Sequence, residues 1–285
     1  MCLGVMMHVT DQSVSPVDVA VSAEERGFDS VFFTEHTHIP VRPFIAFRGG
    51  AAMPEECKRL HDPIVALAAA ASATTSIRLG TGVLVIGQRE PLATAKQLAS
   101  LDRLSGGRLV LGTGYGWHGD ELAQHGIEWQ HRRSVWREHL EALRTLWTAD
   151  EAEYQGTHVN FGPSWSYPKP LQPGGPKVWL GAAGTKANFA NIIDHADGWM
   201  PVESTEPIDQ RLNELRRQAA AADRDPASIE LVIYGSGGDP AQLEHYEQLG
   251  VALVVLGLAA SNVGDLHAQL DHHQSLIDRF AGSNT

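Results

Sequence analysis

Glycine-rich segments at the ends of apolar runs are the part of this sequence best suited to receive a ligand. The tetrapeptide Leu-Gly-Thr-Gly occupies residues 79–82 and again 111–114, and a looser version covers 180–184. Each segment leads into a helical pattern, as in a βαβ unit. Strand ends with almost no side chains allow a large flat molecule to lie against the backbone. The three segments therefore predict a cofactor site.

The third segment continues directly into a helical pattern over residues 186–195. Free N–H groups and the positive end of a helix dipole meet at such a junction, which suits a phosphate group. The alternative is a tight turn that needs glycine for its geometry alone, and the loop by itself favours neither interpretation. The loop after the fourth strand is also glycine-rich, and this favours a binding function.

Aromatic residues in and near these loops need separate interpretations. Tyr115 and Trp117 stand between glycines, so we expect them to form one wall of a planar-ligand site; the alternative is packing over the strand ends. Trp136 and Trp147 recur at helical spacing and are expected in the core. Glycines inside a strand, at residues 80 and 82, indicate a bulge or a close backbone approach, unless they only relieve a crowded layer.

Histidines follow the second strand in the sequence Glu35-His36-Thr37-His38. A His-x-His at a strand end can hold a metal, but metal sites in barrels take further ligands from later strands, and residues 256–260 after the eighth strand offer none. We therefore expect no metal site. The near-neutral pKa of histidine suits His36 to proton transfer instead. His8 stays undecided, and residues 272–273 are expected on the surface.

The elements that would position these residues alternate regularly between strand and helix. Strand-like runs cover residues 3–8, 30–34, 77–86, 108–112, 178–180, 198–200, 229–234 and 251–256, with a hairpin at 153–161. Eight such strands predict a single α/β domain over 1–285, a (β/α)₈ TIM barrel with extended loops after strands 2 and 4. The alternative is an open doubly wound sheet, whose Gly-x-Gly-x-x-Gly fingerprint is missing after the first strand.

Bulk properties exclude several classes of function. The chain of 285 residues has 22 Lys and Arg against 34 Asp and Glu, a net charge of −12. Nucleic-acid binding needs a basic face, so we expect none. The longest apolar runs, 64–73 and 251–260, are shorter than the roughly 20 residues that cross a bilayer. No signal peptide is visible. We expect no membrane partner and a cytoplasmic location, and two cysteines do not make a disulfide framework.

Several motifs taken together resemble a known family. They are His-Asp-Pro at 61–63, Ile-Arg-Leu-Gly-Thr-Gly-Val at 77–83, Pro91, Leu-Asp-Arg-Leu-Ser-Gly-Gly-Arg at 101–108 and Gly-Thr-Gly-Tyr-Gly-Trp at 112–117. This set resembles the luciferase-like monooxygenase superfamily, and within it the branch that uses the deazaflavin coenzyme F420. Residues 178–184 and 196–199 are similar to later motifs of the same family.

The resemblance implies a place for each functional residue. Gly82-Val83 matches a non-proline cis peptide behind the cofactor ring, and His36, the expected catalytic residue, matches a position beside the reactive ring carbon. Some F420 enzymes carry a glutamate acid where this sequence has Trp117. The implied cofactor-binding residues are Gly82, Val83, Gly114, Tyr115, Gly116, Trp117, Gly181, Ala182, Ala183, Gly184 and Thr185.

These observations predict an F420-dependent oxidoreductase that exchanges a hydride with an unidentified small organic substrate. Arg42, Phe44 and Trp165 are candidate substrate contacts, and the resemblance implies a homodimer. The first alternative is an FMN-dependent monooxygenase of the same superfamily. A metal-dependent barrel hydrolase and a non-catalytic barrel that binds a cofactor are the others.

Overall fold

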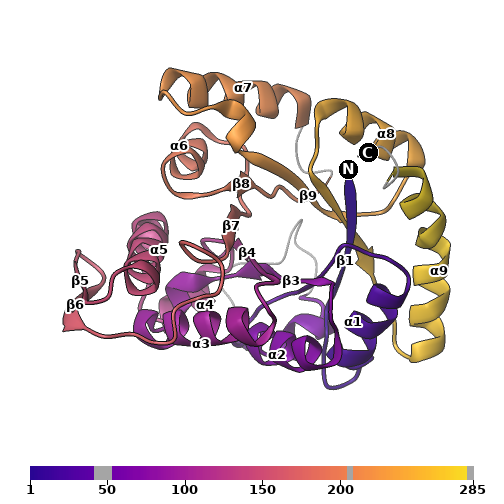
Figure 1. Cartoon of the computed structure of the whole chain (residues 1–285), viewed down its shortest axis with the longest axis horizontal. Helices are drawn as coiled ribbons and strands as arrows, with labels where there is room; N and C mark the ends of the chain where they lie inside the picture. The colour runs from indigo at the N-terminus through magenta and orange to yellow at the C-terminus, as the bar shows by residue number, and fades with distance from the viewer. Residues whose placement is uncertain (42–52, 204–207, 281–285) are drawn as a thin grey trace.

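Eight parallel strands close into a barrel in the computed structural model, which describes residues 1–41, 53–203 and 208–280 (Figure 1). Around the barrel the strands follow the order β1-β10-β9-β8-β7-β4-β3-β2. Their bounds are β1 (Cys2–Met7), β2 (Ser30–Phe33), β3 (Arg78–Leu84), β4 (Leu109–Thr113), β7 (Lys177–Leu180), β8 (Gly198–Trp199), β9 (Glu230–Ser236) and β10 (Leu253–Leu258). The first and last strands pair along six residues, which closes the ring.

Helices surround the barrel and run back between successive strands (Figure 1). Several begin with an acidic or hydroxyl N-cap followed by proline, a combination that fixes the first turn. They are α1 (Pro16–Glu25), α2 (Pro63–Ala73), α3 (Pro91–Leu104), α4 (Gly119–Gln124), α5 (Arg132–Thr148), α6 (Lys186–His195), α7 (Ile208–Ala221), α8 (Pro240–Leu249) and α9 (Val263–Phe280). None of the described helices is long and apolar enough to span a membrane.

A small antiparallel hairpin, β5 (Ala152–Gln155) and β6 (Asn160–Ser164), lies outside the ring of helices, beside α5 (Figure 1). The sequence predicted this hairpin, and the structure confirms it. The segments expected as extended loops after strands 2 and 4 carry short helices. One is the 3₁₀ turn Glu55–Lys58, and the others are α4 and the 3₁₀ turn Trp129–His131.

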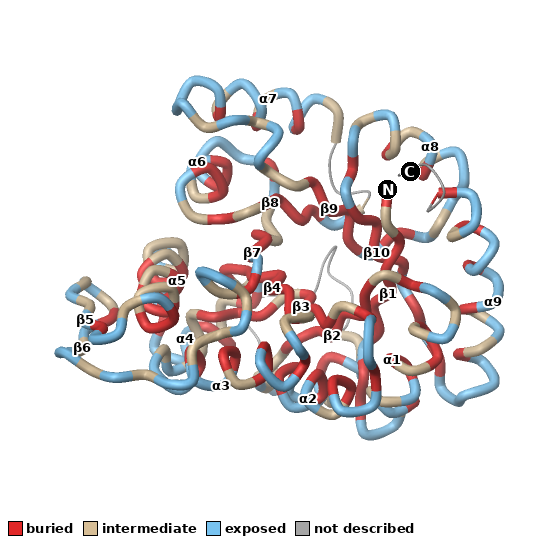
Figure 2. Tube along the Cα trace, in the orientation of Figure 1, coloured by how far each residue is buried: buried red, intermediate tan, exposed pale blue. Residues whose placement is uncertain are grey.

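Two layers of buried apolar side chains stabilise the fold, and Figure 2 shows that buried residues are concentrated on the barrel strands. The outer layer packs the barrel against the helices and contains Trp136 and Trp147, which are buried as predicted. The inner layer fills the barrel with side chains from alternate strand positions, as parallel barrels do. It comprises Met6, Phe32, Val110, Trp179, Met200, Val232, Tyr234, Leu253 and Val255.

The eight predicted strands and the barrel they form are confirmed, each strand to within a few residues. One surface prediction is wrong. His273 is buried against Gly238 in the loop after β9, because α9 turns this side of its helix toward the barrel, whereas His272 is exposed as expected.

Candidate functional site

The Gly82–Val83 peptide bond is cis, as the resemblance implied. The pairing of β3 with β4 shifts between Thr81 and Leu84, so the two residues form a bulge at the C-terminal end of β3. The strand ends of β4 and β7 are the next along the barrel. Catalytic residues of barrel enzymes come from this face, so the bulge marks one side of the candidate site.

Glycines on three neighbouring strand ends make room for this bulge. A Cβ atom at Gly114 would lie 2.7 Å from Cγ2 of Val83, and one at Gly181 would lie 2.6 Å from its Cγ1. A Cβ atom at Gly82 would lie 2.2 Å from the hydroxyl of Tyr234. The bare backbone that the sequence offered to a ligand at these three positions is therefore already covered by protein side chains. The glycines leave room for the bulge, and the bulge positions the side chain of Val83.

Tyr234 supports the bulge from inside the barrel, and sequence reasoning missed it. Its hydroxyl donates a hydrogen bond of 2.7 Å to the carbonyl oxygen of Gly82. The ring packs edge-on against Phe32, with centroids 6.1 Å apart. Burial raises the pKa of this phenol, so Tyr234 remains a neutral donor. In the sequence, the signal for Tyr234 is its place in the strand predicted at residues 229–234.

The loop 181–185 is held firmly at the start of α6. Thr185 is the N-cap and accepts from the N–H of Asn188 at 3.3 Å. The indole of Trp199 donates to the carbonyl of Ala182, and the amide of Asn188 donates to that of Ala183, both at 2.8 Å. These bonds engage the loop's carbonyl oxygens. The N–H groups at a helix N-terminus form a natural anion site.

Positive charge gathers beside this helix end. The guanidinium of Arg133, on α5, donates to the Asn188 side chain at 2.9 Å, and it lies 5.8 Å from the ring centre of Tyr115. Burial, together with the charge of Arg133, lowers the pKa of the adjacent Arg132. A guanidinium group next to a helix N-terminus suits a phosphate or carboxylate ligand.

The two aromatic residues of the loop after β4 separate in the structure. Tyr115 is buried between α5 and α6, where its hydroxyl accepts from Asn191 at 2.7 Å and its ring meets Trp136 edge-on. Burial raises its pKa to about 12. Tyr115 thus follows the packing interpretation. Trp117 is 37% exposed and meets the ring of His36 edge-on, with centroids 5.7 Å apart.

His36 follows β2 and is held by a residue that sequence reasoning missed. Its Nδ1 lies 2.7 Å from Oε2 of Glu121, in the first turn of α4. Burial acts to raise the pKa of Glu121, but hydrogen bonds and charge from His36 and Thr37 outweigh it, and the pKa is lowered. Glu121 is therefore an ionised acceptor at neutral pH.

The residue before His36 anchors the loop. Glu35 is buried, and its carboxylate accepts from the N–H of Val85 at 2.6 Å and from Nε of Arg89 at 2.7 Å. Arg89 also donates to Asp62, the N-cap of α2, at 2.6 Å. Burial raises the pKa of Glu35, against the opposing charge of Arg89. This network fixes the end of β2 to the bulge region of β3 and so fixes the backbone at His36.

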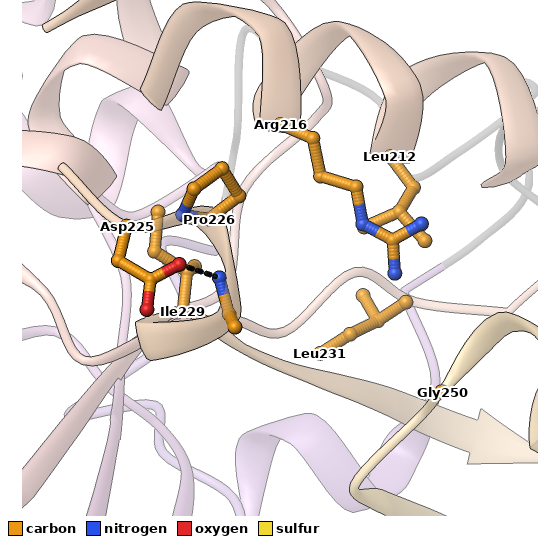
Figure 3. Close-up of a pocket in the computed structure, with 8 residues that line it drawn as sticks. Leu212, Arg216, Asp225, Pro226, Ile229, Leu231 and Gly250 are labelled. Carbon is orange, nitrogen blue, oxygen red and sulfur yellow. Dashed lines mark hydrogen bonds between the residues drawn. The ribbon is translucent and has the colours of Figure 1, made fainter. Parts of the chain in front are cut away.

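Trp165, Arg42 and Phe44 are the remaining predicted substrate contacts. Trp165 directly follows β6, the second strand of the hairpin that lies outside the ring of helices (Figure 1). Arg42 and Phe44 lie outside the described residues. A cavity of about 500 Å³ opens between α7 and the start of β9, with Arg216 and Leu231 in its lining (Figure 3). It adjoins the N-terminal strand end, opposite the face that carries chemistry in barrels. Within residues 1–41, 53–203 and 208–280, no three His, Cys, Asp or Glu side chains are grouped so that they could hold a metal.

A closed parallel barrel with polar and glycine-rich loops at its C-terminal strand ends defines the class of (β/α)₈-barrel enzymes. The family model described as luciferase-like monooxygenase matches residues 7–236, and the chain belongs to this family. The sequence resemblance is thereby confirmed.

Relatives and solved structures agree with this membership. An uncharacterized protein of Mycobacterium tuberculosis is 40% identical over 271 residues, which cover 94% of this chain and 95% of that protein. The F420-dependent glucose-6-phosphate dehydrogenase of Amycolatopsis mediterranei is 33% identical over 185 residues, 59% of this chain and 50% of that enzyme. Curated relatives include a reductase and a dehydrogenase, and the matching family model describes monooxygenases, so the predicted enzyme class, oxidoreductase, is confirmed.

Two solved structures share the fold. Monooxygenase RslO1 from Streptomyces bottropensis matches with a TM-score of 0.79 at 22% identity, covering 98% of this chain and 100% of that one. An F420-dependent secondary alcohol dehydrogenase, in complex with an F420–acetone adduct, matches with a TM-score of 0.74 at 18% identity, covering 97% and 98%.

Proposed function

We propose that this chain is an F420-dependent oxidoreductase that exchanges a hydride between the deazaflavin and a small organic substrate. The observation that carries the proposal is His36, fixed by Glu121 on the same barrel face as the Val83 bulge and the anion-binding loop. Hydride transfer to a carbonyl group needs a proton at the oxygen, and a positioned histidine supplies it. The F420-dependent relative of 33% identity supports the choice of cofactor.

The residues present fit a deazaflavin with a phosphate-bearing side chain. The N-terminal end of α6 and the guanidinium of Arg133 would hold the phosphate. Val83 would support one face of the ring, because Gly114 and Gly181 hold its two methyl groups in place. Trp117 stands at the same rim, against His36. The donor set is cationic and aromatic, which suits an acidic planar cofactor.

When bound, the deazaflavin supplies a carbon that accepts or donates a hydride. The chain supplies position and protons. His36 keeps its Nδ1 engaged with Glu121, so its Nε2 takes a proton from an alcohol oxygen when the imidazole is neutral, or gives one to a carbonyl oxygen when the imidazole is protonated. Trp117 packs against the imidazole and limits the access of water to it. Uncharged Tyr234 holds the Gly82 carbonyl and so keeps the bulge in register.

Titration of the purified protein with F420 and with FMN tests the proposal, with ligand fluorescence as the readout. We expect saturable binding of F420 and oxidation or reduction of the bound deazaflavin by at least one substrate of an alcohol and carbonyl panel. Tight binding of FMN without binding of F420 would reverse the choice of cofactor and favour the monooxygenase. Binding of F420 without turnover across the panel would favour a cofactor carrier.

Gly184→Asp tests the assignment of the anion-binding loop. The new carboxylate would stand where the proposal places a phosphate, and repulsion should reduce F420 affinity by at least 100-fold, a value typical of like-charge contacts that cost several kcal/mol. Gly162→Asp is the matched control, because Gly162 faces open space on β6. Circular dichroism should show both variants folded. Equal F420 affinity of the two variants would disprove the assignment.

A further inference from the structure

The two carboxylate oxygens of Glu121 contact different residues. Oε2 lies 2.7 Å from Nδ1 of His36. Oε1 accepts from the backbone N–H of Thr37 at 3.0 Å and from the Thr37 hydroxyl at 3.2 Å. The side chain of Glu121 is 3% exposed and that of His36 is 12% exposed, so solvent does not compete strongly for these bonds. Glu121 thus contacts two consecutive residues of the chain, His36 and Thr37.

The helix that carries Glu121 is built to hold it in place. His118 is the N-cap of α4, and its Nδ1 accepts from the N–H of Glu121 at 3.2 Å. Leu122 is fully buried, and Gly116, with φ of +79°, allows the tight turn that leads into the helix. The carboxylate therefore approaches His36 from a fixed element of the structure, not from a free side chain.

The chemistry of this contact sets the tautomer of the imidazole. An ionised carboxylate only accepts hydrogen bonds, so the His36 nitrogen that faces it must carry the hydrogen. A partner of this kind on one ring nitrogen decides which form the other nitrogen takes. In neutral His36, Nδ1 then carries the hydrogen and Nε2 holds the lone pair.

We propose that Glu121 is the positioning residue for His36, and that it reserves Nε2 as the atom that exchanges a proton with the substrate. The contact between Nδ1 and the carboxylate, 85 residues away in sequence, carries this inference. It deepens the proposed function, because it names the reacting atom of the same site. Glu121 itself touches neither the hydride nor the substrate in this assignment.

The tautomer can be measured without any cofactor. Protein labelled with ¹⁵N-histidine, at a pH above the titration of its imidazoles, gives long-range ¹H–¹⁵N spectra that distinguish the two neutral forms. His36→Gln identifies the signals of His36 by their loss. We expect wild-type His36 in the Nδ1–H form. The Nε2–H form in the wild type would overturn the proposal directly, whatever the behaviour of any variant.

Glu121→Gln reverses the donor and acceptor roles at this contact. A glutamine amide can donate to Nδ1, so His36 should move toward the Nε2–H form. Gln124→Ala is the matched control on the same helix, because Gln124 contacts His38 instead. We expect the control to leave the signals of His36 unchanged. An unchanged tautomer in folded Glu121→Gln would overturn the proposal.

Kinetics of the F420-loaded protein distinguish a failure of the proposed F420-dependent function from a failure of the positioning role of Glu121. Loss of an orienting partner of this kind typically costs 10- to 100-fold, so Glu121→Gln should lower kcat by that factor and leave KM and F420 affinity within about threefold. If F420 does not bind at all, the proposed function fails while the measured tautomer still decides the role of Glu121. A fall in F420 affinity with unchanged kcat would assign Glu121 to cofactor binding and overturn the positioning role.

Discussion

Val83 is the residue around which the candidate site is organised. Its two methyl groups occupy space that Gly114 and Gly181 leave open, and Tyr234 fixes the peptide before it. Two glycines therefore make room for the Val83 side chain, and Gly82 makes room for Tyr234. This explains why Leu-Gly-Thr-Gly occurs twice: in the first copy it builds the bulge, and in the second it receives the bulge.

Gly114→Ala tests this account of the glycines. The new Cβ would lie 2.7 Å from Cγ2 of Val83, and overpacking of this kind costs about 1–3 kcal/mol. We expect a lower midpoint of urea unfolding and weaker F420 binding, because Val83 must move. Gly162→Ala adds the same atom in open space and should change stability by less than about 0.5 kcal/mol. Equal stabilities of the two variants would refute the account.

Single residues were predictable where the chemistry is local. His36 and Thr185 follow strands directly, so the sequence places them at strand ends. Glu121, Tyr234 and Arg133 could not be predicted in the same way. The contact of Glu121 with His36 spans 85 residues, and that of Tyr234 with Gly82 spans 152. Such contacts depend on strand order and register, which no local pattern specifies.

At the scale of elements, the motif at residues 101–108 has a structural purpose. Asp102 is fully buried at the end of α3 and accepts from the backbone N–H groups of Leu171 and Gln172, at 2.7 and 2.9 Å. Arg108 donates to the carbonyl oxygens of Ala71 and Thr74, which end α2. These family residues fix helices and a loop to the barrel, and their presence in the sequence marks the fold more than the reaction.

Glu24 links the end of α1 to the segment before β3 and gives stability a pH dependence. Its carboxylate accepts from the backbone N–H groups of Thr75, Ser76 and Ile77. Burial opposes ionisation, but these bonds outweigh it and lower the pKa from 4.5 to about 2. Because the folded-state pKa lies below the unfolded one, this stabilisation is complete above pH 4.5 and is lost as the pH falls toward 2.

Thermal unfolding at several pH values tests the role of Glu24. Glu24→Gln should unfold at a lower temperature than the wild type at pH 7, and the gap should narrow steadily between pH 4.5 and pH 2.5. Glu25→Gln, at the exposed neighbouring position, is the control and should follow the wild type throughout. A gap that stays constant with pH would show that the carboxylate's charge is not responsible.

Elements were more predictable than their contacts, with one informative exception. α4 has six residues and lacks an apolar repeat, so its sequence resembles a loop. It forms because His118 caps its first turn and Leu122 inserts into a small apolar cluster with Val85, Ile127 and Val135. The helix that positions the candidate catalytic residue is thus specified by tertiary contacts, which is why the sequence did not reveal it.

At the scale of the whole molecule, the homodimer that the resemblance implies stays a prediction, and two exposed apolar residues on α2 and α3 offer one way to test it. Val65 and Leu92 stand in the first turns of these adjacent helices and are 68% and 41% exposed. Light scattering coupled to size exclusion should give about twice the chain mass of 30.9 kDa. A Val65→Glu, Leu92→Glu double variant should give the monomer mass. A dimer that survives the double variant would place the interface elsewhere.

The pairing of β1 with β10 has a consequence for biosynthesis. The eighth barrel strand supplies residues 253–258 to the first one, so the ring stays open until residue 258 has left the ribosome. Until then the nascent chain presents two unpaired edges, one belonging to β1 and the other to β9. Termination between β9 and residue 253 would leave a curved open sheet whose edges can pair with those of another molecule. The pairing of residues 253–258 with β1 is therefore the step that removes both edges.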